Sequence, residues 1–202
     1  MVPFQFINPA VPKLRERPPE GEGWLHEVKF DGWRVQLHKV GREIIVFSKN
    51  GHDITRRCRW ITEVSTISAR SLIIDGERAE LAALDSEGRP DFDAIGRRGT
   101  AATLCAFDLL ELNGRDLRAL PLVERRRRLK VLSAKAPTHM VFSEDFANPF
   151  ALLAQLEHLA FEGIVSKRVD TPYRSGTACG WVKVKTESWR RRHGERWRQF
   201  TK

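Results

Sequence analysis

The sequence predicts an α+β domain whose strands are mostly antiparallel. Apolar residues fall in short runs that end at turn signals such as Asp31-Gly32 and Asn113-Gly114, which is typical of hairpin-connected strands. A few longer stretches, such as 122–132, instead repeat apolar residues at helical spacing. A chain of 202 residues is long enough to bury a sizeable core, and no fixed repeat divides it.

The N-terminal half is expected to contain an arm, six strands and one helix. Residues 1–23 hold five prolines and two glycines, so we expect an extended arm there, with the ordered domain spanning 24–185. The strands at 72–75 and 78–84 should flank Gly76 as a hairpin-like pair. The other strands are expected at 24–30, 33–40, 43–48 and 103–112, and the helix at 55–69.

The C-terminal half is expected to contain two helices, two strands and a basic tail. Pro121 should open a helix whose leucines are buried, which would place Arg125–Arg128 mostly on the outside. Asn148-Pro149 is a cap and first turn for a helix that continues to Ala160. Strands are expected at 163–169 and 181–185, followed by a basic tail or surface helix at 186–202.

Charge favours a polyanionic partner. Lys and Arg total 35 against 26 Asp and Glu, a net charge of +9. An ordinary basic protein can have the same net charge, so the positions of the charges must decide between the two interpretations.

No run approaches the roughly 20 apolar residues of a membrane helix, and we expect a cytoplasmic protein. Cys58, Cys105 and Cys179 are an odd number without metal-ligand spacing, which indicates reduced thiols.

The first chemically informative segment runs from Glu27 to Arg34. Lys29 lies at the end of an expected strand, so a rigid element holds its amine beside the Asp31-Gly32 turn. Five further segments follow in a fixed order, each on or beside an expected strand. They are Ser48-Lys49-Asn50-Gly51, Asp75-Gly76-Glu77, Phe107-Asp108-Leu109-Leu110, Glu162-Gly163-Ile164-Val165-Ser166-Lys167 and Trp181-Val182-Lys183-Val184-Lys185.

This ordered series resembles the adenylation domain of ATP-dependent DNA ligases, which are covalent nucleotidyltransferases. The likeness extends over residues 24–185 and is strongest to the ligase modules of bacterial end-joining systems. The strings at 113–122 and 170–176 also resemble that group. The resemblance implies two antiparallel sheets flanked by helices, with the nucleotide between the sheets, in agreement with the strand pattern.

The resemblance implies that Lys29 attacks the α-phosphate of ATP, expels pyrophosphate and carries AMP as a phosphoramidate. The attacking amine must be neutral near pH 7, although a free lysine has a pKa of about 10.4. Neighbouring cations favour the neutral form, and Lys167, Lys183 and Lys185 are expected to supply them while binding the α-phosphate. The Asp31-Gly32 turn is expected among the nucleotide-binding residues.

The remaining nucleotide contacts also follow from the resemblance. Phe107 is expected to stack on adenine, while the backbone around Glu27 reads its amino group. Arg34 corresponds to the family's contact to ribose and phosphate. Glu77 and Glu162 offer hard oxygen ligands that suit Mg²⁺, or Mn²⁺ in its place, and they suit the ribose hydroxyls equally.

The implied substrate is nicked or broken double-stranded DNA. Lys49 stands where the family more often has arginine. Lysine keeps the positive charge but lacks the planar guanidinium that can bind a phosphate with two hydrogen bonds. DNA phosphates are expected on Lys49, on the helix at 125–128 and on the tail, above all on Arg190, Arg191 and Arg192.

Two other readings remain open at this point. RNA ligases and capping-type nucleotidyltransferases share the Lys-x-Asp-Gly chemistry, and the choice of ATP or GTP and of DNA or RNA separates them. A non-catalytic DNA-binding remnant of a ligase would bind DNA without forming a lysine-linked AMP.

The end of the chain differs from the family pattern. In the family a small oligonucleotide-binding barrel follows the last lysine strand, whereas here 17 of the 202 residues follow Lys185. We therefore expect a stand-alone core, a truncated gene product, or half of a two-protein enzyme whose partner is a separate barrel or an end-joining protein.

Overall fold

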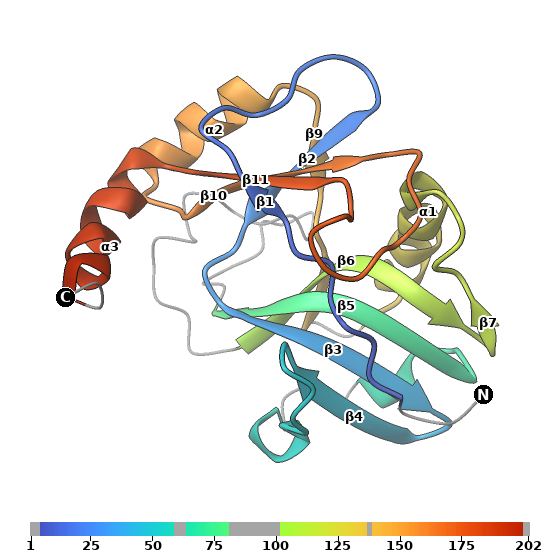
Figure 1. The fold of residues 1–202 in the computed structure, drawn as a ribbon. Coiled ribbons are helices and arrows are strands. Elements are labelled where there is room, and N and C mark those ends of the chain that lie inside the picture. Colours follow the sequence, from blue (N-terminus) through green and yellow to red (C-terminus); the bar gives the residue numbers. More distant parts are fainter. Residues whose placement is uncertain (1–4, 59–63, 81–101, 137–138, 200–202) are drawn as a thin grey trace.

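Two β-sheets form the body of the protein in the computed structural model, which describes residues 5–58, 64–80, 102–136 and 139–199 (Figure 1). One sheet has the order β1-β11-β10-β2-β9, and the other has the order β4-β3-β5-β6-β7, with β8 also paired to β6. All pairings are antiparallel except β1 with β11 and β6 with β8. The α+β class and the two antiparallel sheets are confirmed.

The strands follow the short apolar runs of the sequence. They are β1 (Lys13–Leu14), β2 (Trp24–Lys29), β3 (Trp33–Val40), β4 (Glu43–Ser48), β5 (Ser71–Glu80), β6 (Ala102–Leu112), β7 (Arg115–Asp116), β8 (Met140–Phe142), β9 (Asp145–Phe146), β10 (Gly163–Arg168) and β11 (Trp181–Lys185). The helices are α1 (Leu122–Ser133), α2 (Pro149–His158), α3 (Glu187–Gln199) and the 3₁₀ helix η1 (Thr55–Arg57).

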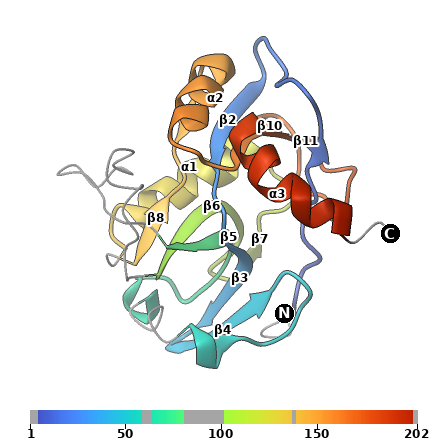
Figure 2. The same cartoon turned by 90° about the vertical axis from the view of Figure 1, so that its left-hand side faces the viewer.

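The chain passes from one sheet to the other between β2 and β3. The turn at 30–32 therefore lies at the seam of the sheets, directly after Lys29. A cluster that includes Val28, Cys105 and Ile164 joins the two sheets beneath this seam, and Leu152 and Leu156 of α2 pack into it. Figure 2 shows α2 and α3 beside the strands β2, β10 and β11. Apolar residues of both sheets therefore pack together beneath the turn that follows Lys29.

The N-terminal arm lies along the molecule rather than away from it. Lys13 and Leu14 pair with β11, and the Val11 amide donates to the carbonyl oxygen of Gly176 at 2.8 Å. The Tyr173 hydroxyl accepts a hydrogen bond from the Ala10 amide at 3.0 Å. Residues 10–14 therefore extend the five-stranded sheet.

The helix expected at 55–69 is wrong. Thr55–Arg57 is a single 3₁₀ turn, a second 3₁₀ turn covers 64–66, and 59–63 lie outside the described residues. Asp53 accepts hydrogen bonds from both the amide and the hydroxyl of Thr55, and Thr55 Oγ1 accepts from the Val46 amide. These side-chain bonds hold the backbone in a turn that competes with a helix.

The hairpin expected around Gly76 is also wrong, because β5 runs without a break from Ser71 to Glu80. Gly76 pairs with Val35, and an added Cβ would lie 2.7 Å from the Leu104 side chain and 2.9 Å from the Cys105 carbonyl oxygen. This glycine therefore serves a close approach of β6 and not a turn. Residues 81–84 of the expected strand lie outside the described part.

The helix that opens after Pro121 is present, but its arginines do not all face solvent. Arg125 and Arg126 are 0% and 4% exposed, whereas Arg127 is exposed. The buried positions are Leu122, Arg125, Arg126 and Leu129, which is the spacing of one helix face. The expectation that Arg125–Arg128 lie mostly outside is therefore wrong for its first two residues.

His38 is buried in β3 as a neutral side chain and should make stability depend on pH. Its Nε2 lies 2.8 Å from Gln36 Oε1, which also accepts the Ile7 amide, so Nε2 donates. Burial lowers the pKa of His38 to about 4. Below pH 6.5 the unfolded chain gains a proton that the folded chain takes up only near pH 4, so stability falls as the pH decreases between these values.

One pKa unit corresponds to about 1.36 kcal/mol. We therefore expect the unfolding free energy to fall by up to about 3 kcal/mol between pH 7 and pH 4.5 because of this histidine. Urea unfolding of wild type, His38→Gln and His52→Gln at both pH values measures it. His38→Gln should flatten the dependence, whereas His52→Gln, at an exposed position, should keep it. Equal dependence in all three proteins would contradict the assignment.

Candidate active site

A cavity of about 260 Å³ opens at the seam of the two sheets. The N-terminal arm supplies Val11 and Pro12 to its wall. Nine of the residues expected to bind nucleotide or DNA line it. They are Glu27, Lys29, Gly32, Arg34, Lys49, Glu77, Phe107, Lys167 and Lys183. Residues separated by more than 150 positions in the chain thus meet in one place.

Three lysines lie around Glu162 at one end of the cavity, which Lys29 and Lys183 line while Glu162 and Lys185 do not. Lys29 Nζ lies 2.8 Å from Glu162 Oε2, and Lys185 Nζ lies 3.0 Å from Oε1 of the same carboxylate. Burial lowers the pKa of Lys183, and the ammonium groups of Lys29 and Lys185 lower it further against the opposing effect of Glu162. This end therefore holds more positive than negative charge and suits phosphate groups.

Position 163 requires a glycine. It lies on β10 between Lys29 of β2 and Lys185 of β11 and pairs with both. Its φ of 146° is a conformation that L side chains rarely adopt, and an added Cβ would lie 2.0 Å from the Val184 carbonyl oxygen. The Glu-Gly step at the start of β10 thereby lets Glu162 reach both lysines.

Glu77 lies on β5 opposite Arg34. Burial raises the pKa of Glu77, and Glu162 adds to this effect, while Lys29 and Arg34 oppose it. The amide of Gly32 donates a hydrogen bond to the Glu77 carboxylate. An added Cβ at Gly32 would lie 2.2 Å from the Arg78 carbonyl oxygen, so the turn after Lys29 packs directly on β5.

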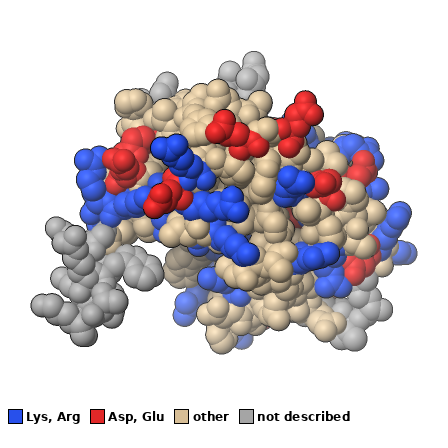
Figure 3. All heavy atoms as spheres, turned by 45° about the horizontal axis from the view of Figure 1, so that its top comes forward, with Lys and Arg blue, Asp and Glu red and all other residues tan. Residues whose placement is uncertain are grey.

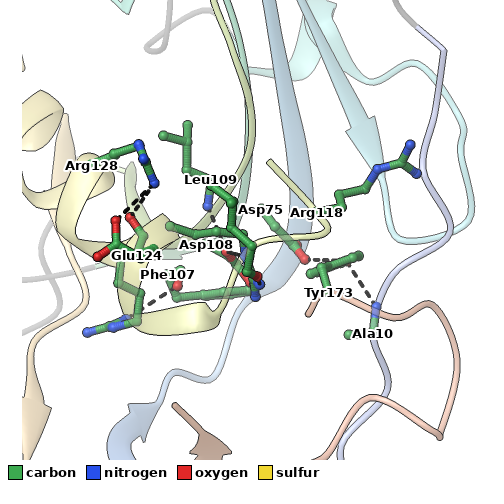
Figure 4. A network of polar contacts seen from close by, with 12 residues as sticks. Ala10, Asp75, Phe107, Asp108, Leu109, Arg118, Glu124, Arg128 and Tyr173 are labelled. Atoms are coloured by element: carbon green, nitrogen blue, oxygen red, sulfur yellow. Dashed lines mark hydrogen bonds and ion pairs between the residues drawn. The ribbon is translucent and has the colours of Figure 1, made fainter. Parts of the chain in front are cut away.

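In this structure the Arg34 guanidinium binds other groups of the protein. Its guanidinium donates to both carboxylate oxygens of Asp75, at 3.0 and 2.6 Å, and to the Ala10 carbonyl oxygen. The Tyr173 hydroxyl donates to Asp75 at 2.7 Å, and Figure 4 shows Asp75, Tyr173 and Ala10 in line. Arg34 thus anchors the arm in this structure, and a contact to ribose or phosphate would require it to leave these partners.

The other end of the cavity is aromatic. Phe107 and Trp181 meet edge to face with centroids 6.0 Å apart, and Lys167 Nζ lies 4.2 and 4.3 Å from the two rings. Lys167 donates to both oxygens of Glu27 at 2.9 Å, and burial lowers its pKa. The structure therefore separates Lys167 from the three lysines at Glu162.

Arg126 is a site residue that the sequence reasoning missed. Its guanidinium donates to Glu27 at 2.6 Å, to the Ser143 carbonyl oxygen at 2.8 Å and to Asp145 at 3.0 Å. It thereby ties α1 to β2 behind the aromatic end. The available signal was its place, four residues after Leu122, on the apolar face of the helix.

The expected DNA-binding residues lie on the surface. Lys49 is exposed at the end of β4 and also lines the cavity. Arg190, Arg191 and Arg192 lie exposed on α3, where Arg191 is 3.7 Å from Glu157 and Arg192 bonds to the Ala160 carbonyl oxygen. Figure 3 shows many Lys and Arg side chains on one face of the molecule, with Asp and Glu side chains among them. Asp31 is exposed in the turn after Lys29 and does not line the cavity.

The described ranges contain no group of three or more His, Cys, Asp or Glu side chains that could hold a metal ion. Magnesium, however, is usually bound by one or two carboxylates together with substrate phosphates. Glu77 and Glu162 fit that pattern, because Glu162 contributes to the raised pKa of Glu77 and a divalent cation would offset this effect.

The sequence model of the ATP dependent DNA ligase domain matches residues 7–185. The multifunctional non-homologous end joining protein LigD of Pseudomonas aeruginosa is 35% identical over 191 residues, covering 91% of this chain and 22% of that protein. A probable DNA ligase of Beutenbergia cavernae is 39% identical over 175 residues, covering 79% of this chain and 33% of that protein. The chain therefore spans a third or less of the length of these two relatives.

Solved structures show the same fold. The ligase domain of M. tuberculosis LigD matches with a TM-score of 0.69 at 27% identity, covering 90% of this chain and 61% of that one. A mycobacterial DNA ligase D complexed with ATP and MES matches with a TM-score of 0.66 at 27% identity, covering 90% of this chain and 62% of that one. An archaeal ATP-dependent RNA ligase matches with a TM-score of 0.59 at 18% identity, covering 91% and 50%, which shows the fold alone.

Proposed function

This chain belongs to the family of ATP-dependent DNA ligase domains, and from that membership we propose that it transfers AMP from ATP to Lys29 and then to DNA, so that a break is sealed. The observation that supports the lysine assignment best is its position. Lys29 lies at the seam of the sheets, in the same cavity as Phe107 and beside two other lysines. Lys183 shares these neighbours but lies within β11, whereas Lys29 ends β2 directly before the turn between the sheets.

The proposed first step joins the Lys29 amine to the α-phosphorus of ATP. A bond forms between Nζ and phosphorus, the bond to the bridging oxygen breaks, and pyrophosphate leaves with the bonding electrons. Glu162 accepts a hydrogen bond from Lys29 in the resting structure, so it is placed to take the proton that the amine loses. Lys183 and Lys185 offset the charge that builds up on the phosphate.

The proposed second and third steps move AMP through DNA. The 5′-phosphate at the break attacks the lysine-bound phosphorus, which returns the electron pair to Nζ and leaves a DNA 5′-adenylate. The 3′-hydroxyl then attacks the 5′-phosphorus and expels AMP, which seals the strand. Phe107 and Trp181 supply the aromatic end that suits the adenine ring throughout.

A divalent cation fits this scheme. Glu77 and Glu162 would hold Mg²⁺ together with phosphate oxygens, and Mn²⁺ has the same preference for oxygen ligands. The ion would offset negative charge on the phosphates.

Intact mass after incubation with ATP and Mg²⁺ tests the first step, and a nicked duplex carrying a 5′-phosphate tests sealing. We expect a mass increase of one AMP and conversion of the nick to a continuous strand. An adduct from GTP and not from ATP would favour a capping-type enzyme, and sealing of RNA alone would favour an RNA ligase. DNA binding without any adduct would identify a non-catalytic remnant.

Salt dependence of DNA binding tests the basic surface of α3. Each phosphate neutralised on duplex DNA contributes about 0.9 to the slope of log affinity against log salt concentration. The double variant Arg190→Ala/Arg191→Ala should therefore weaken binding and lower the slope by up to about 1.8. Arg42→Ala/Lys135→Ala removes the same charge from exposed positions that do not line the cavity between the sheets, and should leave the slope unchanged. Equal slopes in wild type and both variants would exclude α3 from DNA binding.

The expected setting is the bacterial cytosol and nucleoid, because the LigD and probable DNA ligase relatives described above are bacterial proteins. None of the helices in the described ranges is long and apolar enough to cross a membrane. The end-joining relative supports a role in DNA repair, with a separate oligonucleotide-binding barrel or an end-joining protein as the assisting partner.

A further inference from the structure

A second hollow opens beside the nucleotide cavity, between the start of β3 and the loop that follows β4. Its volume is about 600 Å³, and Trp33 and Arg57 contribute to its wall. It shares Gly32, Arg34 and Lys49 with the nucleotide cavity. Whatever occupies this hollow therefore lies next to the cavity that holds Lys29.

Trp33 is an exposed aromatic side chain in a held position. It is 55% exposed although it begins a central strand of the six-stranded sheet. Its cross-strand partner on β5 is Arg78, whose guanidinium carbon lies 5.6 Å from the centroid of the indole ring. A cation over one face fixes the ring and leaves the rest of its surface open, and such a ring is a platform on which nucleobases stack.

Uncompensated positive charge lies beside this indole. Lys49 and Arg57 are both exposed, and neither forms an ion pair with a residue in the described ranges. Asp53 also lines the hollow and keeps its negative charge, with Oδ1 accepting the amide and hydroxyl of Thr55, so the two cations outnumber it. The hollow therefore offers two free cations to an anionic ligand.

The far wall of the hollow is preformed. The Gly51 amide donates to the Ser48 carbonyl oxygen at 2.9 Å, and the Ser48 amide donates to the His52 carbonyl oxygen at 2.9 Å. Phe6 of the arm packs against Gly51 from behind, where an added Cβ would lie 3.0 Å from its ring. A ligand that enters thus orders little of the protein, which lowers the entropic cost of binding.

We propose that Trp33 stacks on a nucleobase of the DNA strand next to the break, while Lys49 and Arg57 contact the phosphates on either side of that base. This assignment rests on the proposed function, because it names where that substrate is held. An indole between separate cations matches the alternation of bases and phosphates along one strand. A protein partner would need a broader apolar surface than a single ring.

A nicked duplex with 2-aminopurine at single positions flanking the nick tests the stacking. Binding to wild type should quench the fluorescence of one flanking position, and Trp33→Leu should abolish this quenching and raise the dissociation constant by about 5-fold to 150-fold. Trp33→Phe, which keeps a ring, should retain part of both effects. Phe150→Ala removes another exposed aromatic side chain, on α2, and should leave binding unchanged.

The outcomes separate this inference from the proposed function. If wild type forms the AMP adduct and Trp33→Leu binds and quenches as wild type does, the stacking site is wrong and the proposed function stands. If Trp33→Leu changes only the ATP concentration needed for the adduct, the hollow is a second nucleotide subsite and the strand assignment is overturned. If wild type forms no adduct but Trp33→Leu still loses DNA binding, the stacking site stands and the proposed function fails.

Discussion

Lys29→Ala should abolish the AMP adduct and should leave the fold intact. The amine is the proposed nucleophile, and alanine provides no group that could form a bond to phosphorus. Glu162 keeps its second partner, Lys185, at 3.0 Å, so the substitution leaves no carboxylate unpaired. Lys29 is partly exposed, and its side chain contributes little packing. Intact mass after incubation with ATP and Mg²⁺, with peptide mapping of the modified residue, measures the result.

Two further variants sharpen this experiment. Lys29→Arg preserves the ion pair with Glu162 but replaces the amine by a guanidinium, which stays protonated, so it should also form no adduct. Lys135→Ala removes an exposed lysine that lines neither the nucleotide cavity nor the hollow beside it and should form the adduct at the wild-type rate. An adduct that persists in Lys29→Ala, or that maps to another lysine, would show that the nucleophile lies elsewhere.

The same variant can separate the steps of the reaction. A nick that already carries a 5′-adenylate needs no lysine-bound AMP, so Lys29→Ala should seal it while failing on ATP and an ordinary nick. Failure on both substrates, with a fold shown to be intact by circular dichroism, would mean that Lys29 also contributes to the last step.

Much of the sheet architecture could be predicted from the sequence because it depends on local patterns. Runs of alternating residues ending at Asp31-Gly32 and Asn113-Gly114 specify strands and turns without knowledge of distant partners. The turn after Lys29 could therefore be placed correctly. The segments on β5, β6, β10 and β11 could be expected near it only through the family resemblance, since pairing across sheets depends on contacts between distant residues.

The errors arose where distant residues override a local signal. Gly76 suggests a turn, but β6 approaches it so closely that only glycine fits inside a continuous strand. The run of arginines on α1 suggests a solvated face, although its first two members have buried acidic partners on other elements. In each case the missing information was the identity of a partner far along the chain.

Arg125 shows the size of such an effect, and replacing it should destabilise the protein strongly. It forms an ion pair with Asp108 in which both side chains are 0% exposed, with donor distances of 2.8 and 2.9 Å. It also donates to the carbonyl oxygens of Leu120, at 2.6 Å, and Thr171, at 3.2 Å. In Arg125→Met a buried carboxylate and two carbonyl groups lose their donor, and removal of one member of a buried pair costs about 3 to 5 kcal/mol. For a chain of this size, we expect the melting temperature to fall by roughly 6 to 20 °C.

Thermal and urea unfolding of three variants would test that account of Arg125. Arg127→Met changes an exposed arginine on the same helix, with only a distant partner in Glu124 at 3.4 Å, and should alter the unfolding free energy by no more than about 0.5 kcal/mol. The double variant Arg125→Met/Asp108→Asn removes the buried negative charge as well, so it should recover part of the loss seen in Arg125→Met. Equal stability of Arg125→Met and Arg127→Met would show that the pair contributes nothing to folding. A double variant less stable than Arg125→Met would show that Asp108 is held mainly by the Leu109 amide, at 2.9 Å, and not by Arg125.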